Sequence, residues 1–228
     1  RQGVRRENRL AGLENPRGQR VAPLALFRGE RRALRTTSHL ELELLAAGQA
    51  LLGFIAATPP GEQLLFLISG GTSSLVEVPL EGVGLDELVR LNHWLLGSGL
   101  DIFGVNGVRR RLSMLKDGRL AAALRGHPVL ALYLSDVEGD DPAWIGSGLL
   151  SRAKSALPSG LPDWLVTLID SGPPPGLPTP PVEGHVVGNL ARALDGCEDR
   201  ARRLGFPVTR HDEWLRGPVA GAADRIVS

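Results

Sequence analysis

Two apolar segments of strand length most constrain the fold, because each runs abruptly into a loop of small or charged residues. QLLFLIS (63–69) continues into GGTSS, and PVLALYLS (128–135) continues into DVEGDD. Apolar runs of this length, without polar alternation, are typical of strands in a parallel sheet that is covered by helices. The sequence therefore predicts two buried, parallel strands, each followed by a loop at the sheet edge.

Segments with helical periodicity lie before, between and after these two strands. Apolar residues recur at helical spacing from His39 to Ala57, and Pro59 with Pro60 ends that pattern. Further helices are predicted at 85–99, within 101–126, at 162–170, at 190–205 and near the end, with two more strands at 185–189 and 206–210. Strands alternating with helices predict an α/β fold, a three-layer α/β/α sandwich with a mostly parallel sheet.

Residues 1–37 differ from the rest of the chain. They contain ten arginines and show no clear period, although VAPLAL (21–26) could form a short strand. A basic arm that binds phosphate is one interpretation, and a weakly ordered terminus is the other. We expect a weakly ordered, arginine-rich segment over 1–37, followed by one domain over 38–228.

Composition excludes several function classes. The net charge is +1 and aromatic residues are few, which argues against a nucleic-acid partner. No apolar run approaches the roughly 18 residues of a membrane span, and the N-terminus lacks an apolar leader. The single cysteine, Cys197, fits a reducing compartment. We therefore expect a cytoplasmic protein without a membrane partner.

The loop SGGTSS has the composition of an anion site. Gly70 and Gly71 allow a ligand to approach the backbone N–H groups closely. Four hydroxyl groups can add hydrogen bonds, those of Ser69, Thr72, Ser73 and Ser74. A helix starting near Ser73 would add a partial positive charge. The loop is either a phosphate or carboxylate site or a ligand-free turn; it matches neither a Walker loop nor a dinucleotide fingerprint.

The loop DVEGDD offers four carboxylates within residues 136–141. Such oxygen ligands suit Mg²⁺, which usually takes one or two carboxylates together with phosphate oxygens. A carboxylate here could instead accept a proton from a substrate hydroxyl, and a solvated acidic turn is the third interpretation. Since parallel strands end at the same edge of a sheet, this loop and SGGTSS should face one crevice.

Polar side chains also recur between the two loops, in NGVRRRLSMLKDGRLA (106–121). On one continuous helix they would share a face, formed by Asn106, Arg109 or Arg110, Ser113 and Lys116. That face either points into the crevice or is a solvent-exposed basic surface.

Three collinear segments together resemble the class II glycerate kinases. The segments are FLISGGTSSLVEVPLEGVGLDELVRLNHWLLGSGLDI, NGVRRRLSMLKDGRLA and LALYLSDVEGDDPAWIGSG, and the similarity is strongest from Leu64 to Gly148. Members of that family have an N-terminal Rossmann-like domain followed by a so-called MOFRL domain, with the active site in the cleft between them. The resemblance implies that this chain carries the N-terminal type of domain without the MOFRL-type domain.

The resemblance also implies a reaction and a set of site residues. Family members phosphorylate D-glycerate with ATP and Mg²⁺, usually giving 2-phosphoglycerate, and some carry the older label hydroxypyruvate reductase. By resemblance, the six residues of SGGTSS and Asn106 would bind phosphate or substrate. The implied catalytic residues are Asp136, Lys116 and Arg109, and the implied metal ligands are Asp136 and Asp140.

One departure from the family pattern bears directly on the chemistry. The family carries an early catalytic lysine in a G-K-A-A-like turn, whereas no lysine precedes Lys116 in this chain. Loss of a cationic contact to the transferring group costs on the order of 10²- to 10³-fold in rate. A site without its opposing domain is also wetter, which weakens the remaining electrostatic contacts. We therefore expect kinase activity to be impaired or absent in this chain.

Two other functions remain open from the sequence. One is an oxidoreductase that acts on hydroxypyruvate, although the missing dinucleotide fingerprint argues against it. The other is a non-catalytic remnant domain that binds a small anion. Apolar surface left by a missing domain would favour self-association of such a chain.

Overall fold

The computed structural model describes residues 13–14, 20–21, 37–154, 156–172, 182–211, 213–215, 217 and 219–227. The chain divides into two compact units, Arg1–Val187 and Gly188–Ser228. Two short strands, β1 (Leu13–Glu14) and β2 (Arg20–Val21), pair antiparallel in the first unit. The remainder of the predicted N-terminal segment, up to residue 36, lies outside the described residues.

The two apolar segments form adjacent parallel strands, as predicted. They are β3 (Leu64–Ser69) and β4 (Val129–Leu134), and β5 (Glu183–Gly188) completes a sheet with the order β3-β4-β5. Leu64 lies opposite Val129, and Ser69 lies opposite Leu134. The α/β class with a parallel sheet is therefore confirmed, and the register places the two following loops at the same edge.

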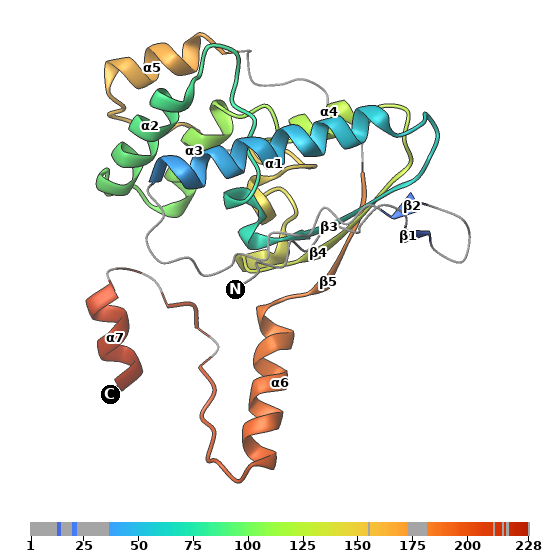
Figure 1. Ribbon diagram of the computed structural model, residues 1–228. Coiled ribbons are helices and arrows are strands. Elements are labelled where there is room, and N and C mark those ends of the chain that lie inside the picture. The colour runs from blue at the N-terminus through green and yellow to red at the C-terminus, as the bar shows by residue number, and fades with distance from the viewer. Residues whose placement is uncertain are drawn as a thin grey trace, which may run out of the picture. The chain divides into compact units, whose positions relative to one another are not determined.

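The helix α1 (Thr37–Ala57) packs along one face of this sheet (Figure 1). It contributes Ala47, Leu51 and Ile55 to a buried cluster that also contains Leu64 and Ile68 of β3. The alternate side chains of β3 point to the opposite face, because successive residues of a strand alternate. There Leu65 and Leu67 are 56% and 68% exposed.

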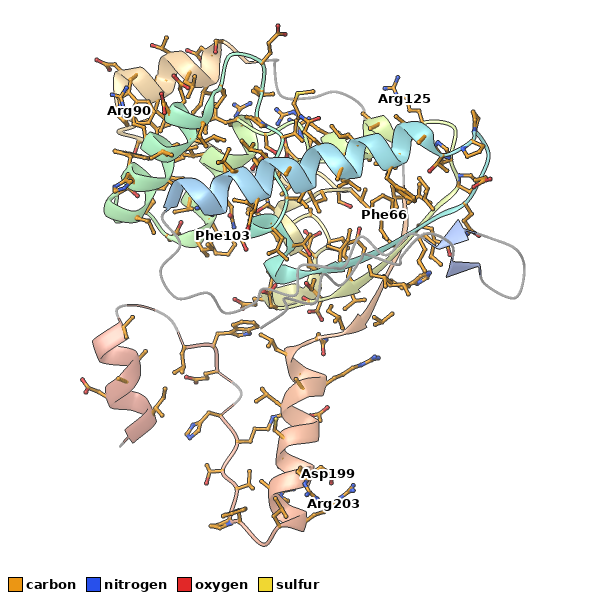
Figure 2. The ribbon with its side chains drawn as sticks, viewed as in Figure 1. Phe66, Arg90, Phe103, Arg125, Asp199 and Arg203 are labelled. Atoms are coloured by element: carbon orange, nitrogen blue, oxygen red, sulfur yellow. The ribbon has the colours of Figure 1, made fainter. Side chains whose placement is uncertain are left out.

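A second buried cluster joins three helices that follow the short 3₁₀ helix η1 (Gly70–Ser74) along the chain. It is formed by α2 (Leu85–Gly97), α3 (Ile102–Arg111) and α5 (Asp163–Asp170), as the apolar periodicity predicted. Arg90 of α2 lies over the ring of Trp164 at 4.1 Å, which adds a cation–π contact to this packing (Figure 2). This cluster fixes the position of α3, which carries the polar side chains of interest.

The predicted helical region 101–126 forms two helices, α3 and α4 (Arg119–Ala123). The helical path is broken between them because Asp117 and Gly118 both adopt positive φ values, 58° and 74°. Ser113 and Lys116 therefore lie in the connection rather than on a helix. The single polar helix face predicted from Asn106 to Lys116 does not form.

The second unit contains α6 (Leu190–Arg203) and α7 (Val219–Val227) in its described part. The Asn189 side chain accepts a hydrogen bond from the Arg192 N–H at 3.0 Å and so caps α6. The strand predicted at 206–210 is wrong, because this segment is irregular. Its Arg210 instead forms ion pairs with Asp195 and Glu198 of α6, which hold the segment beside the helix rather than in a sheet.

Within the described residues, no helix combines the length and the apolar character that a membrane span requires.

Substitution of Leu115 by alanine tests the main buried cluster. Leu115 is fully buried, so Leu115→Ala should lower the free energy of unfolding by about 2–5 kcal/mol. The matched control is Leu96→Ala on α2, because Leu96 is 83% exposed; it should change stability by less than about 0.5 kcal/mol. Urea unfolding followed by circular dichroism measures both values. Equal losses in the two variants would contradict the packing described above.

Candidate active site

The two predicted loops meet at the C-terminal edge of the sheet. After β3 the chain forms a short 3₁₀ helix, η1 (Gly70–Ser74), and Asp136 lies just beyond β4. A Cβ atom at Gly70 would lie 1.7 Å from Oδ1 of Asp136, so this carboxylate packs directly on the glycine backbone. The prediction that both loops share one rim is therefore confirmed, and Gly70 is the residue that permits the contact.

Hydroxyl groups of SGGTSS hold the loop in shape. The Ser69 N–H donates a hydrogen bond to Thr72 Oγ1 at 3.1 Å, and the Ser74 hydroxyl donates to the Gly71 carbonyl at 2.8 Å. The helix begins at Gly70 rather than near Ser73 and is only five residues long. The predicted contribution of a helix N-terminus at Ser73 is therefore wrong, and the hydroxyl groups and glycines remain the candidate ligand contacts of this loop.

The acidic loop folds into two tight turns, η2 (Glu138–Asp140) and η3 (Ile145–Ser147). Asp136 is exposed at its start, while Asp140 adopts a left-handed backbone with φ of 54°. Over the described ranges, no three His, Cys, Asp or Glu side chains gather as a possible metal site. A Mg²⁺ ion on Asp136 and Asp140 would therefore need phosphate oxygens or water to complete its octahedral coordination.

A pocket of about 90 Å³ lies between α1, η1, α2 and α3. One part of its wall is polar and consists of Ser73, Ser74, Glu77, Asn92, Arg109 and Lys116. The other part is apolar and consists of Leu44, Leu45, Leu88, Leu91 and Leu112. The structure therefore brings four predicted site residues, Ser73, Ser74, Arg109 and Lys116, into one cavity. Asp136, Asp140 and Asn106 do not line it.

A buried ion pair forms part of the polar wall. The Lys116 ammonium group pairs with Glu77, and the Ser113 hydroxyl donates a hydrogen bond to the same carboxylate. The Lys116 side chain is only 3% exposed and that of Glu77 is 15% exposed. Lys116 is therefore held in place by Glu77, so its charge acts on the pocket from a fixed position.

Sequence reasoning missed Glu77, which lies far from Lys116 along the chain. Backbone pairing brings the two together: the Met114 N–H donates to the Val78 carbonyl at 2.7 Å, and Leu80 N–H donates to the Leu112 carbonyl at 3.0 Å. No motif within either segment signals this pairing. Only the tertiary structure could have identified Glu77.

Arg109 provides the second cation of the pocket. It projects from α3, and its Nη2 donates a hydrogen bond to Oδ1 of Asn92 at 3.1 Å. Burial lowers the pKa of Arg109, and the negative charge of Glu77 opposes that effect. A guanidinium group stays protonated despite such a shift because its ordinary pKa is so high. Asn92 was also missed, since an isolated asparagine on a helix carries no sequence signal.

Two other polar residues of α3 serve the scaffold. Oδ1 of Asn106 accepts a hydrogen bond from the Ser147 hydroxyl at 3.3 Å, which ties α3 to η3. Arg110 is 1% exposed, donates to the Ala143 carbonyl at 2.9 Å and lies 4.3 Å from the ring centroid of Trp144. Burial lowers the pKa of Arg110 as well. Both residues therefore anchor the acidic loop against α3.

Gly70→Ala tests the contact between the two loops. The added methyl group would overlap Asp136, so the loops must separate, at a cost of about 1–3 kcal/mol in the free energy of unfolding. Gly71→Ala is the control, because a Cβ at Gly71 would meet nothing within 4 Å. Thermal and urea unfolding of both variants measure the difference. A Gly70→Ala protein as stable as Gly71→Ala would show that Asp136 does not pack on Gly70.

Removal of Lys116 tests the buried ion pair. Lys116→Met leaves the Glu77 carboxylate without its charged partner, and we expect a loss of about 3–5 kcal/mol in stability. Glu77→Leu combined with Lys116→Met should recover part of that loss, because no unpaired charge remains. A double-mutant cycle from urea unfolding gives the coupling energy, expected at about 1–3 kcal/mol. A coupling energy near zero would contradict the ion pair.

Comparison with known proteins places these features in a family. Residues 41–159 match the family model described as "Domain of unknown function (DUF4147)". The D-glycerate 2-kinase of Thermotoga maritima is 39% identical over 155 residues, which cover 64% of this chain and 37% of that protein. A putative hydroxypyruvate reductase of Agrobacterium vitis is 41% identical over 102 residues, which cover 45% of this chain and 26% of that protein.

A solved structure agrees with the sequence comparisons. The crystal structure of glycerate kinase from Thermotoga maritima matches with a TM-score of 0.56 and 34% identity, covering 72% of this chain and 41% of that chain. This chain thus spans well under half the length of these relatives. The family match over residues 41–159 includes both rim loops and the described residues that line the pocket. The chain therefore belongs to the DUF4147 family, the family of the glycerate kinases, and carries part of its N-terminal domain.

Proposed function

We propose that this chain contains the substrate-binding part of an ATP-dependent glycerate 2-kinase, which converts D-glycerate to 2-phosphoglycerate. The observation that carries the proposal is the meeting of SGGTSS and the acidic loop at one sheet edge, with Asp136 packed on Gly70. The reaction in this proposal is the one that relatives named as glycerate kinases carry in their names. The rim position is where α/β proteins of this type bind ligands.

The proposed roles follow from the position of each group. The exposed backbone and hydroxyl groups of η1 would bind the phosphate of the nucleotide. Arg109 and Lys116 would stabilise the negative charge that phosphoryl transfer brings to the site. Asp136 would accept the proton from the substrate hydroxyl as that oxygen bonds to the transferred phosphorus and the bond to ADP breaks.

Asp136 and Asp140 are the residues that would hold a Mg²⁺ ion. Their oxygen atoms suit this cation, which commonly binds one or two carboxylates and completes its coordination with phosphate oxygens and water. When bound, such an ion neutralises charge on the phosphate groups. The exposed position of Asp136 beside η1 is consistent with this role.

The 228-residue chain should turn over slowly or not at all by itself. Within these residues no lysine precedes Lys116, and Lys116 is engaged by Glu77. A missing cationic contact to the transferring group lowers the rate by about 10²- to 10³-fold. If turnover is absent altogether, the chain is a non-catalytic domain that still binds a small anion. Cytoplasmic location and self-association stay predictions from the sequence.

A hydroxypyruvate reductase is the second candidate function, since a relative carries that name. Reduction of hydroxypyruvate would require a nicotinamide cofactor, and the sequence of SGGTSS does not match the glycine spacing of a dinucleotide site. Oxidation of NADH in the presence of hydroxypyruvate distinguishes this function from the kinase.

The deciding assay is ATP- and Mg²⁺-dependent formation of 2-phosphoglycerate from D-glycerate. We expect the 228-residue chain to be at least about 10²-fold slower than the full-length Thermotoga maritima enzyme. Asp136→Asn should remove the remaining turnover because it abolishes the proton acceptor. Asp170→Asn is the matched control, since Asp170 is exposed on α5 and does not line the pocket.

Each outcome of the assay bears on the proposal. Turnover equal to that of the full-length enzyme would contradict the expected loss of kinase rate. Unchanged turnover in Asp136→Asn would remove Asp136 from the mechanism. Oxidation of NADH that depends on hydroxypyruvate, without formation of 2-phosphoglycerate, would favour the reductase.

A further inference from the structure

The outer edge of β3 is a surface that the proposed function does not use. The Leu64 N–H donates to the Pro128 carbonyl at 2.9 Å, so every second residue from Leu64 directs its backbone groups toward β4. The N–H and C=O groups of Leu65 and Leu67 therefore point away from β4. Over the described ranges the sheet has the order β3-β4-β5, and no backbone hydrogen bond joins Leu65 or Leu67 to another segment.

The residue types of β3 leave this edge unprotected. Exposed sheet edges commonly carry charged residues, proline or a bulge, which prevent pairing with another strand. The other edge strand of the described sheet, β5, follows this rule, because Glu183 and His185 are exposed on it and form an ion pair. In contrast, β3 reads LLFLIS and contains neither a charge nor a proline. Leu65 and Leu67 are also exposed on the face opposite α1, so apolar side chains lie beside the free backbone groups.

The spacing of the free groups fits a second copy of the same strand. In an antiparallel pair, residues that exchange both hydrogen bonds alternate with residues that exchange none. With Phe66 on a two-fold axis, Leu65 lies opposite Leu67 of the second copy, and each free N–H and C=O of these two residues finds a partner. Phe66, which packs on the buried cluster beneath α1 (Figure 2), then lies opposite its own counterpart. Since the strand carries no charge, no like charges oppose each other.

We propose that two copies of this chain associate through β3, in an antiparallel pairing centred on Phe66. The pairing continues the sheet from one copy into the other and brings the exposed leucines of both copies side by side. A dimer with two-fold symmetry uses the same surface on both copies, and the register centred on Phe66 meets that condition. The inference goes beyond the proposed function and does not depend on the kinase reaction.

Sedimentation equilibrium tests the association. All measurements use the Cys197→Ser chain, because the exposed Cys197 would otherwise allow a disulfide between copies. One chain has a mass of 24.3 kDa, and the measured mass should rise toward twice that value as the concentration increases to about 1 mM. A mass of one chain throughout this range overturns the proposal, whether the edge is free or another segment of the same chain covers it.

Leu67→Pro tests whether the strand edge is the contact. Proline removes the N–H of residue 67, which points away from β4, so the pairing of β3 with β4 is retained and the pairing between copies is lost. The dissociation constant should rise at least about tenfold, because the symmetric pair loses the same hydrogen bond twice.

Leu67→Thr is the matched control for the proline variant. It also removes the leucine side chain, but it keeps the N–H and a side chain that favours strands. We expect it to raise the dissociation constant by no more than about threefold. Equal weakening in the two variants would assign the association to the apolar face of the sheet and overturn the edge pairing.

Disulfide formation tests the register, and it decides the question if Leu67→Pro is not folded. Phe66→Cys places the two new sulfur atoms across a non-hydrogen-bonded pair, whose Cα atoms lie about 4.5 Å apart and within disulfide range. In Leu65→Cys the two Cα atoms are offset by two residues and lie roughly 8 Å apart, which is beyond that range. Mild oxidation should therefore cross-link Phe66→Cys and leave Leu65→Cys as single chains, with circular dichroism confirming that both are folded. Faster cross-linking of Leu65→Cys overturns the register.

Discussion

The parallel pairing of β3 with β4 is the interaction on which the candidate site depends. Its register sets Ser69 beside Leu134, so both strands end at the same level. The loops that follow must then share one edge of the sheet. Because α1 buries the side chains of Leu64 and Ile68 on one face, a slip of one residue would expose them, and the hydrophobic core thereby protects the geometry of the loops.

Two close contacts convert that arrangement into a site. The carboxylate of Asp136 occupies space that any side chain at Gly70 would fill, so the acidic loop can approach η1 only because residue 70 is glycine. Beside η1, Glu77 pairs with Lys116, and the negative charge of Glu77 also acts on Arg109. The short helix η1 therefore contacts the acidic rim at Gly70 and lines, with Ser73 and Ser74, the pocket that also contains Glu77, Arg109 and Lys116.

Local patterns predicted most of the elements, since the signals lie within each segment. The apolar runs of β3 and β4 and the periodicities of α1, α2, α5 and α6 needed no long-range information. The predicted helix face from Asn106 to Lys116 failed because the left-handed residues Asp117 and Gly118 and the pairing of 78–80 with 112–114 interrupt the helix. The strand predicted at 206–210 failed because the ion pairs of Arg210 hold that segment along α6.

The sequence by itself determined the α/β class, the two loops at one sheet edge and the resemblance to the glycerate kinases. Those conclusions rest on residues close together in the chain, where spacing and composition carry the information. Only the tertiary structure decided that Lys116 pairs with Glu77, that Arg110 is buried against Trp144 and that Arg109 faces the pocket. These outcomes depend on contacts between segments that are distant in the sequence and on which side chains become buried. A local sequence pattern contains neither the long-range contacts nor the burial of individual side chains.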